Sequence, residues 1–191
     1  MSIALVTDST ASLPAGVAAE RDITVVPLQV VIGATSYEIY RRSPGGSFAS
    51  RGTSLTTSFN DSASANTAYL YRVRAVNLGG SSGDSSADLA TTVMFTEDPM
   101  SAGVPVRAVH LSQLRTAVSA VRAQAGLSSA TYTDPAAPGV IVRAIHIAEL
   151  RTYLDQALAA LGRTTGGWTG ATLRGAVIRA THLQQIRDRV K

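Results

Sequence analysis

Three copies of one ten-residue phrase constrain the fold of this chain more than any other feature. They read VRAVHLSQLR at 106–115, VRAIHIAELR at 142–151 and IRATHLQQIR at 178–187. Each copy holds one of the chain's three histidines, His110, His146 and His182, which are 36 residues apart (146 − 110 and 182 − 146). A fixed period of this length predicts a repeat architecture, in which each unit buries its apolar face only against its neighbours.

Each repeat predicts one helix. An aromatic residue and a turn open the unit, a glycine follows, and a helix is expected to begin near Arg107, Arg143 or Arg179. Gly126 and Gly162 are expected as the residues just past the first two helices. Apolar residues at helical spacing define one buried stripe on each of those helices. They are Leu111, Leu114, Val118, Val121 and Ala125 in the first, and Ile147, Leu150, Leu154, Ala157 and Leu161 in the second.

The preceding 60 or so residues have a different sequence pattern, which is typical of an all-β segment. Ser36–Arg42 and Tyr69–Asn77 alternate between apolar and polar residues, as half-buried strands do. Pro44–Gly46 predicts a turn, and Leu89–Met94 predicts a last strand. Residues 2–33 read instead as strand, helix and strand, with Ile3–Val6 and Ile23–Ile32 as the strands and a helix from about Leu13 to Glu20.

Each of these three segments resembles a known protein family. Residues 1–33, through VTDSTASLP at 6–14 and VVPL at 25–28, resemble the start of the bacterial DegV family of fatty-acid-binding proteins. That family holds its lipid in a far longer two-domain body, so the resemblance does not extend to lipid binding. Residues 34–94 resemble a truncated fibronectin type III domain with Tyr69 as its corner tyrosine. Residues 95–191 resemble helical repeats that follow such domains in secreted bacterial proteins.

Together these observations predict an α+β chain in three parts. A DegV-like stub (1–33) completes a truncated β-sandwich of fibronectin III type (34–94), its strand Ile23–Ile32 substituting for a missing sandwich strand, and a three-repeat α-helical bundle (95–191) follows. The joint near residue 33 cuts both partners within a domain, which indicates a chimera of two unrelated gene fragments, such as a metagenomic library produces.

Composition narrows the function. The chain has no cysteine, which excludes disulfides, thiolate metal sites and a cysteine nucleophile. Its net charge of +4 is spread along the repeats without a polybasic run, so we expect no nucleic-acid partner. The longest apolar stretch, Ile23–Gly33, is too short to span a bilayer, so no membrane partner is expected. Without a basic signal-peptide start this chain is expected in the cytoplasm, whereas the parent of its C-terminal part is expected to be secreted. A homo-oligomer is compatible with the sequence.

The three equivalent histidines carry the sharpest functional hypothesis. If the helices converge, His110, His146 and His182 form the three-imidazole ligand set of a catalytic Zn²⁺ site, or a site for another divalent transition metal. Zinc held in this way yields a hydroxide nucleophile at neutral pH. The hypothesis predicts a promiscuous zinc-dependent hydrolase of small-molecule activated esters or phosphoesters, with Glu149 as a base three residues after His146.

The alternative is a non-catalytic adhesion or binding module. Each histidine then lies half-buried at the flank of its stripe and hydrogen-bonds within its own unit. Asp98 and Asp134 are candidates to orient a histidine, although a role in an Asx or proline turn is favoured for both, and Gly170 takes their place in the third unit. Three arginines at the other edge of the stripes are expected to pair with carboxylates or carbonyls: Arg115, Arg151 and Arg187.

Overall fold

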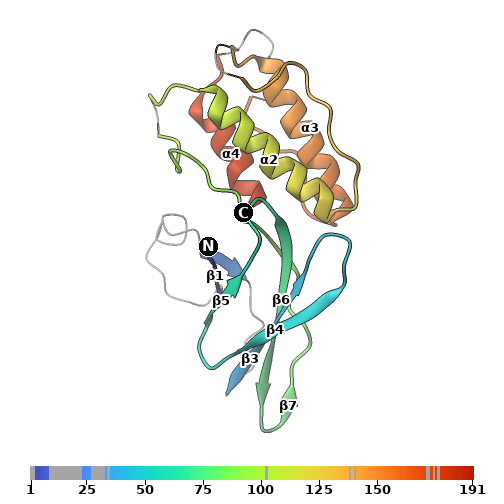
Figure 1. Ribbon diagram of the computed structural model, residues 1–191. Coiled ribbons are helices and arrows are strands. Elements are labelled where there is room, and N and C mark those ends of the chain that lie inside the picture. The colour runs from blue at the N-terminus through green and yellow to red at the C-terminus, as the bar shows by residue number, and fades with distance from the viewer. Residues whose placement is uncertain are drawn as a thin grey trace. The chain divides into compact units, whose positions relative to one another are not determined.

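The computed structural model separates the chain into two compact units, one made of residues 1–65 and 69–92 and the other of residues 66–68 and 93–191. The structure describes residues 3–8, 23–26, 33, 35–101, 103–137, 139, 141–170, 173, 175 and 177–191. An antiparallel sheet and three helices make the described chain α+β, as predicted (Figure 1). In the described residues no helix is long and apolar enough to cross a bilayer.

The larger sheet of the first unit has the order β4-β3-β6-β7, and β8 also pairs with β6. Its strands are β3 (Ser36–Arg42), β4 (Phe48–Ser54), β6 (Ala68–Asn77), β7 (Gly80–Ser81) and β8 (Asp88–Thr91). The predicted strands 36–42 and 69–77 are therefore confirmed, as is the turn, in which the Gly46 N–H donates to the Ser43 carbonyl at 3.0 Å. Strand β8 ends at Thr91, three residues before the predicted end.

A second sheet has the order β2-β1-β5, from β2 (Ile23–Val26), β1 (Ile3–Asp8) and β5 (Ser58–Ser62). Strand β1 runs parallel to β2 and antiparallel to β5. The strand expected at 23–32 is described only over residues 23–26, which reach the later β segment through β1, with Leu5 opposite Asn60. The predicted helix at 13–20 and the end of the predicted strand, 27–32, lie outside the described residues.

The core of the first unit combines aromatic and aliphatic side chains from three strands: Ile39, Tyr69, Tyr71, Val73 and Ala90. Beside them lies a buried carboxylate, Asp61, which is 3% exposed. Its oxygens accept hydrogen bonds from Arg41 (2.7 Å), Arg51 (3.0 Å) and the Tyr71 hydroxyl (3.0 Å). The buried charge is thus fully partnered, which is the condition for keeping a carboxylate in a core.

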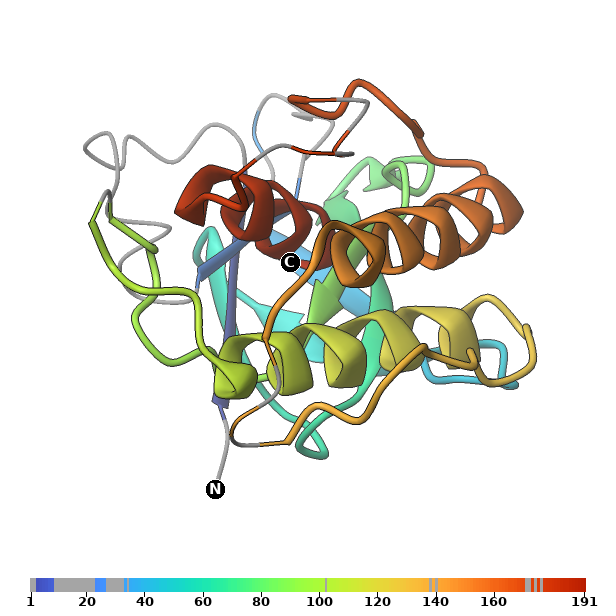
Figure 2. The ribbon, with the colours of Figure 1, turned by 90° about the horizontal axis from the view of Figure 1, so that it is seen from above.

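The second unit contains α2 (Ala108–Gln124), α3 (Ala144–Ala160) and α4 (Ala180–Val190). Each of these helices packs against the other two, and Figure 2 shows α2 in yellow-green, α3 in orange and α4 in red. The predicted starts are confirmed, since Arg107, Arg143 and Arg179 are the N-cap residues. Gly126 and Gly162 follow the first two helices at φ +73° and +69°, a left-handed conformation that glycine adopts without strain.

The apolar stripes also lie where the spacing predicts. Leu114, Val118, Leu150 and Leu154 are fully buried, and Leu111 is 1% exposed. Only the last position of each stripe, Ala125 and Leu161, is half-buried. The contact faces of the helices therefore follow directly from the 3.6-residue period.

Candidate functional site

The three histidines occupy the same structural position, the third residue of each helix. In every unit the backbone N–H of the N-cap arginine donates to Nδ1 of the histidine, at 3.2 Å for His110 and 3.1 Å for His146 and His182. A helix N-terminus leaves backbone N–H groups without helical partners, and arginine has no acceptor with which to cap them. Histidine here performs the reciprocal half of a capping box, where Glu or Gln is usual.

All three imidazoles are buried. His110 and His146 are 0% exposed and His182 is 6% exposed. The expectation of half-buried histidines was therefore wrong, because the turn that opens each unit folds back over the ring. The expectation that each histidine hydrogen-bonds within its own unit is met by the contact between Nδ1 and the backbone N–H.

A carboxylate from the opening turn lies against the other ring nitrogen in the first two units. His110 Nε2 is 2.9 Å from Glu97 Oε2, and His146 Nε2 is 3.1 Å from Asp134 Oδ2. The prediction that Asp134 lies against its histidine is therefore confirmed. The corresponding prediction for Asp98 in the first unit was wrong. The first turn holds one residue more, and Glu97 takes the position facing the histidine.

Each of these carboxylates also pairs with the N-cap arginine, Glu97 with Arg107 and Asp134 with Arg143. The hydrogen bond from Arg107 is the main reason that the pKa of Glu97 lies below its usual value. His146, followed by Arg143, lowers the pKa of Asp134 in the same direction. Both carboxylates are therefore ionised at neutral pH.

The third unit keeps the backbone of this arrangement, and none of its described residues places a carboxylate against His182. Gly170 has φ +62°, against +56° for Glu97 and +59° for Asp134, so the three residues hold the same left-handed conformation. A Cβ added to Gly170 would lie 3.4 Å from His182 Nε2. Residues 170–178 contain no Asp or Glu at all.

Hydrogen bonding fixes the tautomer of the imidazoles. A backbone N–H only donates, so Nδ1 is the acceptor and the ring proton of a neutral histidine sits on Nε2. Burial, followed by the charge of Arg187, lowers the pKa of His110. Burial and then the charges of Arg151 and Arg179 lower the pKa of His182. These two rings are therefore neutral at pH 7.

The described residues contain no group of three or more His, Cys, Asp or Glu side chains arranged to hold a metal ion. The structure thus does not bring the three histidines together as one ligand set. A zinc ligand must offer a lone pair, whereas the Nδ1 lone pair is used by the backbone N–H and Nε2 carries the proton. Coordination through Nε2 would require a change of tautomer and the loss of the cap.

Glu149, the candidate base, is also held by a local contact. Its carboxylate accepts hydrogen bonds from the backbone N–H of Thr133, at 3.0 Å, and from the Thr133 hydroxyl. Gln113 and Gln185, at the equivalent positions, accept from the N–H of Thr96 and of Thr169, also at 3.0 Å. The residue three places after each histidine therefore fastens the opening turn to its helix.

The arginines five places after each histidine connect one unit to another. The sequence predicted that they pair with carboxylates or carbonyls. Arg115 donates to the carbonyls of Thr133 and Asp134, and Arg151 donates to those of Thr169 and Gly170. The expectation of carbonyl partners is confirmed. Each guanidinium also lies over the aromatic ring that opens the unit it contacts: Arg115 over Tyr132, Arg151 over Trp168 and Arg187 over Phe95.

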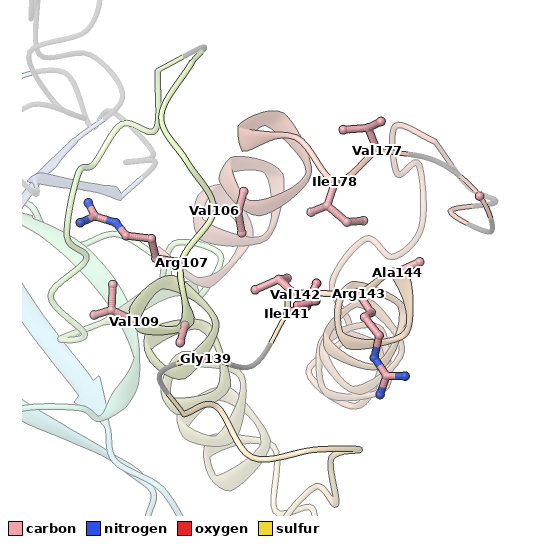
Figure 3. A pocket seen from close by; sticks show the side chains of 12 residues that line it. Val106, Arg107, Val109, Gly139, Ile141, Val142, Arg143, Ala144, Val177 and Ile178 are labelled. Atoms are coloured by element: carbon pink, nitrogen blue, oxygen red, sulfur yellow. The ribbon is translucent and has the colours of Figure 1, made fainter.

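A pocket of about 990 Å³ lies at the N-terminal ends of the helices (Figure 3). The residues that precede the three N-caps, Val106, Val142 and Ile178, all line it, so the three helices begin around one point. Ile141 and Val177, also in the lining, are 80% and 73% exposed. The guanidinium groups of Arg107 and Arg143 point away from these apolar side chains (Figure 3).

Among the described lining residues those two arginines are the only ionisable ones. Arginine stays protonated in proteins, so it neither donates nor accepts a proton at neutral pH. The described lining of the pocket therefore offers an apolar surface without a nucleophile or a general acid or base.

Comparison with known proteins adds little to this geometry. Residues 2–68 match the sequence model of the DegV family, which is described as uncharacterised. The match spans about a third of the chain and continues past residue 33 through β3, β4 and β5. No curated protein matches the chain.

A solved structure of the twitchin kinase region from C. elegans (Fn31-NL-kin-CRD-Ig26) is similar at 25% identity, over 35% of this chain and 13% of that one. Its TM-score of 0.31 is too low to carry an argument about fold or function.

Proposed function

We propose that the chain is a non-catalytic binding module in which His110, His146 and His182 stabilise the starts of three helices. The observation that carries this proposal is the hydrogen bond from each N-cap backbone N–H to Nδ1. It recurs in all three units, including the third, in which no described carboxylate faces the ring. A residue kept for capping needs only this acceptor, whereas a metal ligand needs the opposite tautomer.

The absence of free catalytic groups at the described site supports the same conclusion. The Glu149 carboxylate accepts a hydrogen bond from Thr133. The other two units have Gln at this position, and a Gln side chain is not basic. The apolar pocket at the helix starts is lined by aliphatic side chains and arginine stems. Such a surface suits binding more than bond cleavage.

For the domains, we propose that residues 34–94 are a truncated fibronectin type III domain and that residues 95–191 are three structural repeats. The backbone N–H of Ser64 donates to the Tyr69 hydroxyl at 3.0 Å, a contact that resembles the tyrosine corner of such sandwiches. Residues 1–33 then contribute β1 to a sheet with β5. The fusion of gene fragments near residue 33 stays a prediction.

The competing hypothesis is the zinc-dependent hydrolase of activated esters or phosphoesters predicted from the three histidines. Metal analysis of the purified protein, together with thermal melts with and without a chelator, decides between the two. The binding-module proposal expects less than stoichiometric transition metal and melts that a chelator leaves unchanged. One tightly held zinc per chain, with a melting temperature that falls on chelation, would overturn it, because metal binding would then be coupled to folding.

A further inference from the structure

The third repeat has the cationic half of a carboxylate-binding arrangement whose anionic half is built into the other two repeats. In the first unit the Glu97 carboxylate contacts both Arg107 and His110 Nε2. In the second unit Asp134 contacts both Arg143 and His146 Nε2.

The equivalent residues of the third unit are Arg179, His182 and Gly170. His182 is 6% exposed, and its Nδ1 is held by the backbone N–H of Arg179 at 3.1 Å, as in the other units. Its Nε2 therefore carries a proton to donate. Within the part of the chain that the structure describes, that Nε2 contacts no carboxylate, because Gly170 has no side chain to supply one.

We propose that Arg179 and His182 bind the carboxylate group of an external ligand, in the position that Glu97 and Asp134 fill in the other repeats. The guanidinium supplies the charge, and the Nε2–H supplies a directed hydrogen bond to one carboxylate oxygen. Gly170 supplies no side chain at this position, where an added Cβ would lie 3.4 Å from both His182 Nε2 and Leu173 Cδ2. This site rests on the tautomer argued above for structural histidines, and it adds a ligand class to the proposed binding module.

Positive potential at this point also favours an anion. Arg151 and Arg179 both act electrostatically on His182. Arg151 donates to the carbonyls of Thr169 and Gly170, so its charge is held beside the turn that the ligand would approach. Asp155 acts on Arg151 with the opposite charge, and residues 170–178 add no Asp or Glu.

The test uses the full chain and acetate as the probe. Three histidines give three imidazole NMR signals, which single His→Gln variants assign. Acetate is titrated against chloride at constant ionic strength and pH 7.5. We expect a saturable shift of the His182 signal alone, with a Kd that is roughly millimolar or weaker for so small a ligand.

Two reciprocal variants serve as matched controls. Gly170→Asp supplies an internal carboxylate at a φ of +62° that Asp tolerates, so the His182 signal should stop responding to acetate. Asp134→Gly removes the internal carboxylate at a φ of +59° that suits glycine, so the His146 signal should start to respond. Arg179→Gln should weaken binding about tenfold or more. Circular dichroism confirms that each variant is folded.

Three outcomes would overturn the site: no saturable shift at His182, equal shifts at all three histidines, or an unchanged response in Gly170→Asp. Metal analysis of the same sample separates this failure from failure of the proposed function. If the protein is metal-free and does not respond to acetate, only the proposed carboxylate site is wrong. If it holds stoichiometric zinc, the proposed structural role of the histidines is wrong.

The source of the carboxylate is resolved by comparing acetate with aspartate blocked at both backbone ends. Tighter binding of blocked aspartate assigns the site to an acidic side chain of a protein partner. Equal or tighter binding of acetate assigns it to a free small carboxylate. Both results support the carboxylate site.

Discussion

The guanidinium of Arg187 in the last helix donates to the carbonyl oxygen of Glu97 at 2.8 Å, across 90 residues of sequence. Arg115 and Arg151 make the same contact to the unit that follows theirs, so Arg187 returns the series to the first unit and closes it into a ring. Stacked solenoid repeats leave their two ends open. In this bundle the last repeat contacts the first.

Burial makes Arg187 more important for stability than Arg115, its half-buried equivalent. Arg187 is 0% exposed, and Asp98 Oδ1 lies 3.7 Å from it. Replacing it by Met leaves the buried contacts to the Thr96 and Glu97 carbonyls without their donor and removes one of the cations beside Asp98, so Arg187→Met should lower the free energy of unfolding by about 3–5 kcal/mol. Arg115→Met, at a half-buried equivalent, should cost about 1–2 kcal/mol. Urea denaturation followed at the helical dichroism band measures both, and an equal or smaller effect of Arg187→Met would contradict the buried contact between Arg187 and the first unit.

Substitutions of His146 test whether its hydrogen bond from the Arg143 N–H stabilises the start of α3. His146→Ala removes the acceptor of the Arg143 N–H and opens a gap in the core, so we expect a loss of about 1–3 kcal/mol of unfolding free energy. His146→Gln restores an acceptor at the third helical position, where Gln is common, and should recover a large part of that loss. Thermal melts with and without a chelator report the result. A loss of bound zinc in both variants would instead show that His146 is a ligand.

Acid should destabilise the helical unit before it protonates the carboxylates. The pKa values of His110 and His182 are lowered from 6.5 in the folded chain, so below pH 6.5 the unfolded chain binds more protons than the folded one. Their contribution to the free energy of unfolding should therefore be present above pH 6.5 and be lost as the pH is reduced from 6.5 towards 5. Glu97 and Asp134, with lowered pKa values, add a loss only below their ordinary values of 4.5 and 3.8.

Urea denaturation at a series of pH values between 8 and 5 measures this slope. Its control is the double variant His110→Gln and His182→Gln, which keeps an acceptor at both caps and replaces the two imidazoles whose pKa values are lowered. The variant should have a shallower slope than the parent chain. An unfolding free energy that stays constant or rises as the pH falls from 7 to 5 would contradict the lowered pKa values.

In the first unit, stability should depend on the buried carboxylate. Asp61→Asn takes the charge away from Arg41 and Arg51 while leaving both guanidinium groups in place, so we expect a loss of about 3–5 kcal/mol. Asp84→Asn is the matched control, because Asp84 also pairs with two arginines but its side chain is 27% exposed. That substitution should cost less than about 1 kcal/mol. Urea denaturation followed at the dichroism band of the β-strands measures both losses. Equal effects of the two substitutions would contradict the expectation that the buried carboxylate contributes more to stability than the partly exposed one.

How far the sequence predicts this structure depends on the range of the interaction. Helix starts, buried stripes and terminal glycines follow from local periodicity and were all predicted. Strands β4 and β5 were not predicted, because FASRGTS and SFNDS are rich in small polar residues and do not alternate. They become strands through pairing with β3 and β1, which no local pattern reveals.

The site shows the same division. The repeated phrase identified the histidines, but not the tautomer that their caps impose, because the N-cap residue is arginine and no Ser, Thr or Asp marks a capping box there. The extra residue in the first turn hid the equivalence of Glu97 and Asp134. The contact between Arg187 and Glu97 depends on closure of three units, which a period alone does not distinguish from open stacking.

Glu149 gives the clearest test of catalysis against structure. If Glu149 is a base, Glu149→Gln removes its basicity and reduces the rate of ester or phosphoester hydrolysis. The structure predicts no change in any such rate, and a change in unfolding free energy within about 0.5 kcal/mol, because Gln113 and Gln185 already make the equivalent contact to Thr96 and Thr169. Glu149→Ala, which leaves the Thr133 N–H without its acceptor, should cost about 1 kcal/mol. Hydrolysis of an activated ester and urea denaturation of both variants measure these effects, and a Gln variant that is stable but slower would restore Glu149 as a base.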